Sequence, residues 1–261
     1  MKKIIEFKNT NFAYNSQNKF EDFCMDIDAT DIVSLIGPSG SGKTSILKMI
    51  CHRLPNETVY YNGQKIGSYN INDIRRKIIV VFDEPFRKTT IEDELIQYLG
   101  VCDLTILERQ ELVRQMMDYF ELNELKGKGL NDLSLNHKYL IKILRYLIIE
   151  PEFIAIDCLF SALNYETKVK IIDFIKERKI TLLNVTNDLT DTLFGNKIYV
   201  LSDFTLVLEG PTQTVLKTDT MLKRFGFKLP DEVELSIELI NYGILNKIYL
   251  DKEKLVNSLW K

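Results

Sequence analysis

Gly37, Gly42, Lys43 and Thr44 follow the spacing G-x-x-x-x-G-K-[ST], a pattern that binds phosphate groups. Glycines tolerate positive φ and carry no Cβ, so the backbone can wrap closely around phosphate oxygens. Successive N–H groups and the start of the following helix then face the anion. In this arrangement Lys43 reaches the β- and γ-phosphates, and the Thr44 hydroxyl binds Mg²⁺. The predicted nucleotide-binding residues are Gly37, Pro38, Ser39, Gly40, Ser41, Gly42, Lys43, Thr44 and Ser45.

The residues on either side of this loop predict the strand and the helix that must position it. Ile32–Ile36 is a short apolar run typical of a strand, and residues 46–50 place their apolar side chains on one helical face. Strand, glycine-rich turn and helix in this order are the context that a phosphate-binding loop requires. A chance match in a glycine turn is expected in on the order of one per cent of chains of this length. The two flanking elements make that alternative rarer still.

The remaining hydrophobic patterns predict an α/β fold. Residues 1–30 alternate as strands do and predict an antiparallel β layer. A fully apolar run that ends in an aspartate, Phe153–Asp157, is typical of a strand buried in a parallel sheet. Further strands are predicted at 78–82 and 180–185, a hairpin at 197–208 around Ser202 and Asp203, and helices within 92–125, at 136–149, at 165–179 and along the chain after Pro211.

Composition excludes several function classes. The net charge is −3, so a nucleic-acid binder held by a basic surface is not expected. The N-terminal residues lack the apolar core of a signal peptide. Glu150, Pro151, Glu152 and Asp157 interrupt the longest apolar stretch, at 146–163, so it cannot cross a bilayer without burying charge. We therefore expect a soluble protein whose membrane role, if it has one, comes through a partner.

Cysteine and histidine usage argues against a metal or disulfide framework. The four cysteines are widely scattered with no CxxC spacing, which favours reduced thiols in a cytoplasmic protein. The two histidines, His52 and His137, are too few and too far apart in the chain to suggest a metal site.

From the phosphate loop onward, the order of segments resembles the ATPase of ABC transporters along nearly the whole chain. VVFDEPFRKTTIEDEL resembles the Q-loop region and the start of the helical subdomain. NDLSLNHKYLIKILRYLIIEPEFIAIDCLFSALN resembles the signature motif, its helix, the Walker B strand and the D-loop, and NVTND resembles the H-loop. The resemblance implies a P-loop NTPase fold with an antiparallel β layer, a helical subdomain and a small helical C-terminal extension. It also implies ATP and Mg²⁺ as cofactors.

The resemblance assigns roles to three residues outside the loop. Tyr14 lies where such ATPases place the aromatic ring that stacks on adenine, although a tyrosine packed in the core is an alternative. Asp157 is the Walker B aspartate, which implies a role beside Thr44 in holding Mg²⁺. Asp83 stands at the Q-loop glutamine position, where a carboxylate can bind Mg²⁺ directly, and a solvated loop acid is an equally open alternative.

The chain departs from the family at positions that carry chemistry. Cys158 replaces the glutamate that orients and deprotonates the attacking water, and Asn187 replaces the H-loop histidine. A thiol is mostly neutral at pH 7, and loss of a positioned general base costs on the order of 10²–10⁴-fold in rate. Without an evident basic partner, Cys158 is expected to be an inert buried cysteine rather than a nucleophile. Asn187 can still donate a hydrogen bond to a γ-phosphate but cannot carry a proton as imidazole does.

The signature motif is altered as well. In the family two ATPases close head to tail, and the signature of one chain contacts the nucleotide of the other. Side chains replace its two glycines, so Cβ atoms occupy space next to the γ-phosphate, while Ser134 keeps one hydrogen-bond donor. Base composition alone explains a loss of glycines but not the accompanying loss of the glutamate and the histidine. The signature residues predicted to act in trans are Leu133, Ser134, Leu135, Asn136 and His137, and Asn164 takes the place of the D-loop aspartate.

The tail resembles the C-terminal extension of ATPases in energy-coupling factor (ECF) importers, with GFKLPDEVELSIELI as its most telling part. We predict a nucleotide-binding domain at 1–212, with a helical subdomain at about 86–150, and a helical extension at 213–261. The resemblance implies an ATP-binding subunit of an importer of vitamins, other micronutrients or metals, at the cytoplasmic face of the membrane. Its partners would be a second ABC ATPase, an integral membrane coupling subunit and a substrate-binding membrane subunit, with no nucleic acid.

Two alternatives stay open at this point. The first is a nonhydrolysing regulatory or assembly subunit that responds to ATP. The second is the ATPase of another ABC transporter type, which would share every motif except the tail. A small-molecule kinase is not expected, because no lid segment with catalytic arginines follows the loop.

Overall fold

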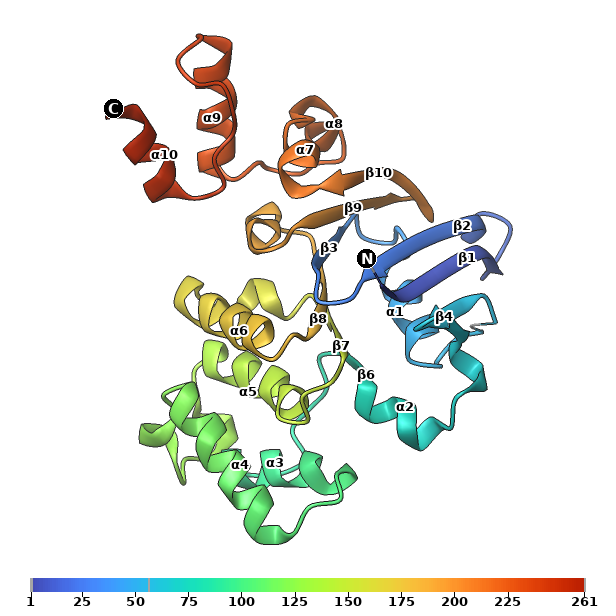
Figure 1. The fold of residues 1–261 in the computed structure, drawn as a ribbon, viewed down its shortest axis with the longest axis vertical. Helices are drawn as coiled ribbons and strands as arrows, with labels where there is room; N and C mark the ends of the chain where they lie inside the picture. Colours follow the sequence, from blue (N-terminus) through green and yellow to red (C-terminus); the bar gives the residue numbers. More distant parts are fainter. Residues whose placement is uncertain (1, 56, 261) are drawn as a thin grey trace.

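A six-stranded sheet with the order β10-β9-β3-β8-β7-β6 forms the centre of the molecule in the computed structural model, which describes residues 2–55 and 57–260 (Figure 1). Strand β3 runs parallel to both of its neighbours, and only the edge strand β10 pairs antiparallel, with β9. The strands are β3 (Ile32–Ile36), β6 (Ile78–Val81), β7 (Phe153–Asp157), β8 (Thr181–Thr186), β9 (Lys197–Ser202) and β10 (Thr205–Pro211).

Both faces of this sheet are covered, which explains why its central strands are mostly apolar, although Ser34 of β3 and Asn184 of β8 are buried polar residues. On β3, Val33 and Leu35 pack into one core together with helix α1 (Lys43–Ile50) and a second sheet. Ile32 points to the opposite face, where α5 (Leu135–Leu147) and α6 (Tyr165–Glu177) supply the partners. The alternation of side chains along one strand thus separates two cores.

The second sheet is the predicted antiparallel layer. Its order is β2-β1-β4-β5, built from β1 (Lys3–Ala13), β2 (Lys19–Asp28), β4 (Val59–Tyr61) and β5 (Gln64–Lys65). Its inner face joins the core around α1, and Phe7 packs edge-on against Phe23 there. The sequence did not predict β4, β5 or helix α2 (Ile71–Lys77), because each is short, and β5 and α2 are also largely exposed.

A helical region lies between β6 and β7, at the bottom of Figure 1. It contains α3 (Ile91–Tyr98), α4 (Ile106–Tyr119) and α5. Thr90 caps α3, and Thr105 and Glu108 form a capping box on α4, so both starts satisfy their free N–H groups. The helices predicted within 92–125 and at 136–149 are confirmed, and α5 begins one residue early, at Leu135.

The predicted hairpin, formed by β9 and β10, is confirmed with two differences in its bounds. Asp203 and Phe204 both have positive φ, 47° and 62°, so Phe204 belongs to the tight turn and not to the strand as predicted. Strand β10 also continues beyond the predicted end at residue 208, as far as Pro211.

The C-terminal helices lie beside β9 and β10, at the top of Figure 1. They are α7 (Thr212–Leu216), α8 (Asp219–Arg224), α9 (Asp231–Asn241) and α10 (Lys252–Leu259). Leu222 and Val233 share a core with Ile36 and Val200 of the central sheet. Among the residues that the structure describes, no helix is long and apolar enough to span a bilayer.

Candidate nucleotide site

The loop between β3 and α1 lies at the carboxyl end of the central sheet, where open α/β folds bind ligands. Gly40 and Gly42 have φ of 83° and 105°, which side chains rarely adopt. A Cβ on Gly37 would stand 2.2 Å from the backbone oxygen of Leu201, closer than real atoms approach. The glycines therefore allow both the turn and its close fit against the β9–β10 hairpin.

Lys43 is folded back onto this loop. Its Nζ donates to the carbonyl oxygens of Gly37 at 2.6 Å and Pro38 at 2.9 Å, and the residue is 7% exposed. Burial lowers the pKa of Lys43, and nearby Cys158 and Asp157 act in the opposite direction. This ammonium lies near the N-terminus of α1 and is bonded to neutral carbonyl oxygens. It is therefore suited to exchange these carbonyl oxygens for charged phosphate oxygens.

Thr44 and Asp157 bring together the two groups expected at a magnesium ion. The Thr44 hydroxyl donates to Asp157 Oδ2 at 3.3 Å, although 113 residues separate them in the chain. Burial raises the pKa of Asp157, and hydrogen bonds from Thr44 and Cys158 partly offset that effect. Among residues 2–55 and 57–260, no cluster of three or more acidic, histidine or cysteine side chains forms a metal cage. Mg²⁺ fits this pair, because it commonly takes one or two protein oxygens together with substrate phosphates.

Tyr14 lies beside the phosphate loop with its ring in solvent. It follows β1, is 51% exposed, and its hydroxyl accepts a hydrogen bond from Ser45 Oγ at 3.3 Å. The ring packs edge-on against Phe12, with centroids 4.8 Å apart. Tyr14 is therefore not a core tyrosine, and its stacking on a base stays a prediction.

Cys158 corrects one expectation. The side chain was predicted to be buried, but the residue is exposed, because it leaves the end of β7 with φ of 58° and turns out of the sheet. Its N–H still donates to Val185 O at 2.9 Å, which keeps it beside β8. Partial burial raises the pKa of the thiol, the neighbouring Asp157 carboxylate raises it further, and Lys43 acts in the opposite direction. The thiol is thus neutral at pH 7, although the residue is exposed.

Asn187 is exposed directly after β8, and the residue before it, Thr186, bonds to a buried charged group. Asp191, which is 1% exposed, accepts from Lys168 Nζ at 2.6 Å and from Thr186 Oγ1 at 2.8 Å. Burial raises the pKa of Asp191, and the Lys168 ammonium opposes that shift. Sequence reasoning missed this group, since nothing in the spacing of Lys168 and Asp191 predicts their contact.

Asp83 follows β6 and makes an ion pair with Lys142 of α5. The carboxylate is about half exposed, so it is neither a freely solvated loop acid nor, in this arrangement, a free ligand. Lys142 was not singled out from the sequence, where 59 residues separate the two. A role for Asp83 at magnesium stays a prediction, with Lys142 as its competitor.

The altered signature forms the start of α5. Ser134 caps the helix by accepting from the N–H of His137 at 3.3 Å, and its hydroxyl also lies 3.0 Å from His137 Nδ1. Leu133 is buried, whereas Leu135 is 70% exposed. Asn136 bonds toward the start of α6 and not toward the phosphate loop. Ser134 and Asn136 thus bond to the starts of α5 and α6, and a role of the signature residues in trans stays a prediction.

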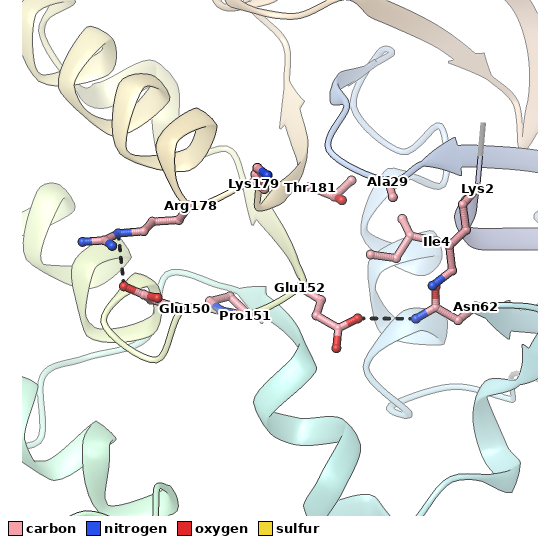
Figure 2. A pocket seen from close by; sticks show the side chains of 10 residues that line it. All are labelled: Lys2, Ile4, Ala29, Asn62, Glu150, Pro151, Glu152, Arg178, Lys179 and Thr181. Carbon is pink, nitrogen blue, oxygen red and sulfur yellow. Dashed lines mark hydrogen bonds and ion pairs between the residues drawn. The ribbon is translucent and has the colours of Figure 1, made fainter.

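A separate cleft lies at the opposite, amino-terminal edge of the sheet (Figure 2). Arg178 pairs there with Glu150 at 3.2 Å, and the Asn62 amide donates to Glu152 at 3.4 Å. Because open α/β sheets bind ligands at the carboxyl ends of their strands, this cleft is not the nucleotide site.

Fold and loop together define a P-loop nucleotide-binding protein. Residues 20–159, more than half of the chain, match the family model described as ABC transporter. The chain therefore belongs to the ABC transporter family, and it carries the phosphate loop of an ATP-binding ATPase subunit. The predicted fold class is confirmed.

Relatives that match the chain over its full length indicate which type of ABC ATPase it resembles. The chain is 27% identical to the energy-coupling factor transporter ATP-binding protein EcfA1 of Lactobacillus delbrueckii, covering 99% of this chain and 97% of that protein. It is 26% identical to EcfA1 of Enterococcus faecalis, covering 100% and 98%. The predicted resemblance to ECF-type ATPases is thereby confirmed.

Solved structures agree on the fold. The cbiO1 protein of Clostridium perfringens, part of the ABC transporter complex cbiONQ, superposes with a TM-score of 0.75 at 18% identity, covering 94% of this chain and 99% of that one. The ATP-binding cassette MJ0796, a dimer bound to ADP and Pi, gives a TM-score of 0.69 at 25% identity, covering 80% and 99%.

Proposed function

We propose that this chain is the ATP-binding subunit of an ECF-type importer that binds Mg·ATP but hydrolyses it slowly. The observation that carries the proposal is the contrast between two neighbours at the end of β7. Asp157 is held against Thr44, as a magnesium ligand should be, whereas Cys158 places a neutral thiol where the general base belongs.

Binding rests on groups that the fold has already brought together. Lys43 exchanges the carbonyls of Gly37 and Pro38 for phosphate oxygens, while Thr44 and Asp157 supply oxygens to the cation. The loop N–H groups at the start of α1 complete the cradle. Bound ATP would supply the charge that draws a second cassette onto this face.

Hydrolysis lacks two groups in this chain. A thiol whose pKa is raised accepts a proton poorly at pH 7, and Asn187 cannot carry the charge of an imidazolium. Absence of the base lowers the rate by on the order of 10²–10⁴-fold. ATP would thus hold the dimer closed here, and a partner ATPase would perform most of the turnover.

The assembly follows from the same resemblance. A second ATPase, an integral membrane coupling subunit and a substrate-binding membrane subunit would place this chain at the cytoplasmic face of the membrane. The full-length similarity to EcfA1 proteins, tail included, supports this arrangement. Co-purification with a polytopic membrane protein is the expected result, whereas an exclusively soluble complex would favour a regulatory or assembly subunit.

Calorimetry with the purified chain tests the nucleotide site. Wild type should bind Mg·ATP, and Lys43→Ala should abolish the heat of binding because the loop loses its only ammonium contact with the phosphates. Lys65→Ala, which removes an exposed charge from β5, is the matched control and should bind as wild type does. Unchanged affinity in Lys43→Ala would refute the site, and rapid ATP turnover by the wild-type chain alone would refute slow hydrolysis.

A further inference from the structure

One amide side chain joins the starts of two helices that lie far apart in the sequence. Asn136, in the first turn of α5, accepts a hydrogen bond from the backbone N–H of Asn164 through Oδ1 at 2.8 Å. Its Nδ2 donates to Thr167 Oγ1 at 3.1 Å. Both ends of the amide are therefore bonded to the start of α6, and a glycine at position 136 could make neither contact.

Each helix start is also closed by its own cap. Asn164 Oδ1 accepts from the N–H of Thr167 at 2.9 Å on α6, and Ser134 caps α5. Asn136 thus links two ordered turns rather than two flexible loops. Thr167 is 9% exposed, so the bond from Asn136 Nδ2 is partly shielded from water, whereas the bond from the Asn164 N–H lies at the surface.

The hydrogen bond from Asn164 to Asn136 also fixes one end of the loop that carries Cys158. At its start, the N–H of Cys158 donates to Val185 O at 2.9 Å, and inside it Ser161 Oγ donates to Cys158 O at 3.0 Å. At its end, Asn164 is held by Asn136. Residues 158–164 are consequently fixed between β8 on one side and the start of α5 on the other.

We propose that Asn136 is a positioning residue that makes the 158–164 loop and the start of α5 move as one body. The loop belongs to this chain's own nucleotide site, and the start of α5 is the segment offered to a partner's site. A single amide therefore transmits a displacement from one site to the other. The second part of this inference rests on the proposed function, whereas the link itself does not.

Amide hydrogen exchange followed by NMR tests the link in the nucleotide-free chain. Asn136→Gly removes both bonds, so the Asn164 amide should exchange about fivefold faster, the change expected for one net hydrogen bond. The Leu163 amide, which donates to Phe160 O at 3.1 Å, is an internal reference and should keep its rate.

Two further variants separate the link from general loosening. Leu135→Gly puts a glycine on the adjacent, exposed residue of the same helix start and should leave exchange at Asn164 unchanged. Asn136→Asp keeps an oxygen that accepts from Asn164 and should restore most of the protection. An Asn164 amide that exchanges at the wild-type rate in Asn136→Gly, or equally fast in Leu135→Gly, would overturn the proposal.

Adding Mg·ATP tests transmission. In wild type, ATP should alter exchange at Asn164 and also at His137 on α5, and in Asn136→Gly the change at His137 should disappear. An equal change at His137 in both proteins would overturn transmission by Asn136. A failure of the proposed function would look different, because ATP would then change the exchange rate of no amide in wild type, as expected for Lys43→Ala. The exchange rates of the nucleotide-free proteins would still test whether Asn136 holds Asn164.

Discussion

Arg145 and Glu94 form an ion pair in which both side chains are 0% exposed, and replacing Arg145 by methionine should destabilise the protein strongly. Arg145 Nη1 lies 3.0 Å from Glu94 Oε1 and also donates to Pro85 O at 3.3 Å. The other carboxylate oxygen of Glu94 accepts from the N–H groups of Arg87 and Lys88, each at 2.9 Å. The pair therefore fastens the segment after β6 to α3 and α5 at once.

The size of the effect follows from what remains after the change. Removing one partner of a buried pair costs about 3–5 kcal/mol, since the other charge stays buried without compensation. Glu94 would keep its two backbone donors, which places the expected loss near the lower end, about 3 kcal/mol. Arg145→Lys should also destabilise, because an ammonium cannot replace the planar guanidinium that packs beside the Tyr98 and Tyr146 rings, whose centroids lie 5.0 and 5.1 Å from the guanidinium carbon.

Urea unfolding followed by circular dichroism measures this free energy. The double variant Glu94→Gln, Arg145→Met removes both charges and should be more stable than the sum of the single losses predicts. Arg114, whose side chain pairs with Glu111 in solvent, is the matched control, and Arg114→Met should unfold at the wild-type urea concentration. An Arg145→Met protein that loses less than about 1 kcal/mol would show that the buried pair does not hold this region together.

Two further predictions concern the nucleotide site. Gly37→Ala should cost about 1–3 kcal/mol of stability and weaken ATP binding, because its Cβ would lie 2.2 Å from Leu201 O. Thermal unfolding and calorimetry test this, and Gly100→Ala, whose added Cβ would have its nearest neighbour 3.8 Å away, is a neutral control. Alkylation of Cys158, followed by peptide mass spectrometry, should be slower at pH 7.5 than that of free cysteine and should accelerate as pH rises toward its raised pKa, since only the thiolate reacts. Mg·ATP should slow it further, and alkylation at the rate of free cysteine would contradict the raised pKa.

Most of the central sheet could be predicted because the apolar residues of each strand identify it in the local sequence. Ile32–Ile36 and Phe153–Asp157 were predicted with the observed bounds, since strands buried on both faces are mostly apolar. The phosphate loop could also be predicted from the sequence, because its local backbone geometry requires the glycines. Short edge elements such as β4 and β5 carry too few residues for periodicity to show.

Contacts across the chain could not be predicted. The pairs Lys142–Asp83 and Asn136–Asn164 depend on how α5 packs, and no local pattern encodes that. The exposure of Cys158 was predicted wrongly for a related reason. The end of its strand at Asp157 was predicted correctly, but the positive φ of Cys158 turns this residue out of the sheet, and no local pattern encodes that turn.

Burial explains how binding and hydrolysis can separate in one chain. The residues that build the loop, Gly37 and Lys43, are buried and fixed by backbone contacts, so changing them disturbs the fold as well as the site. Cys158, Asn187 and Leu135, which stand where the family has its hydrolytic and signature groups, are all exposed. Exposed substitutions usually cost little stability. The substitutions at these positions would therefore leave folding intact, and with it the loop that we propose binds the phosphates.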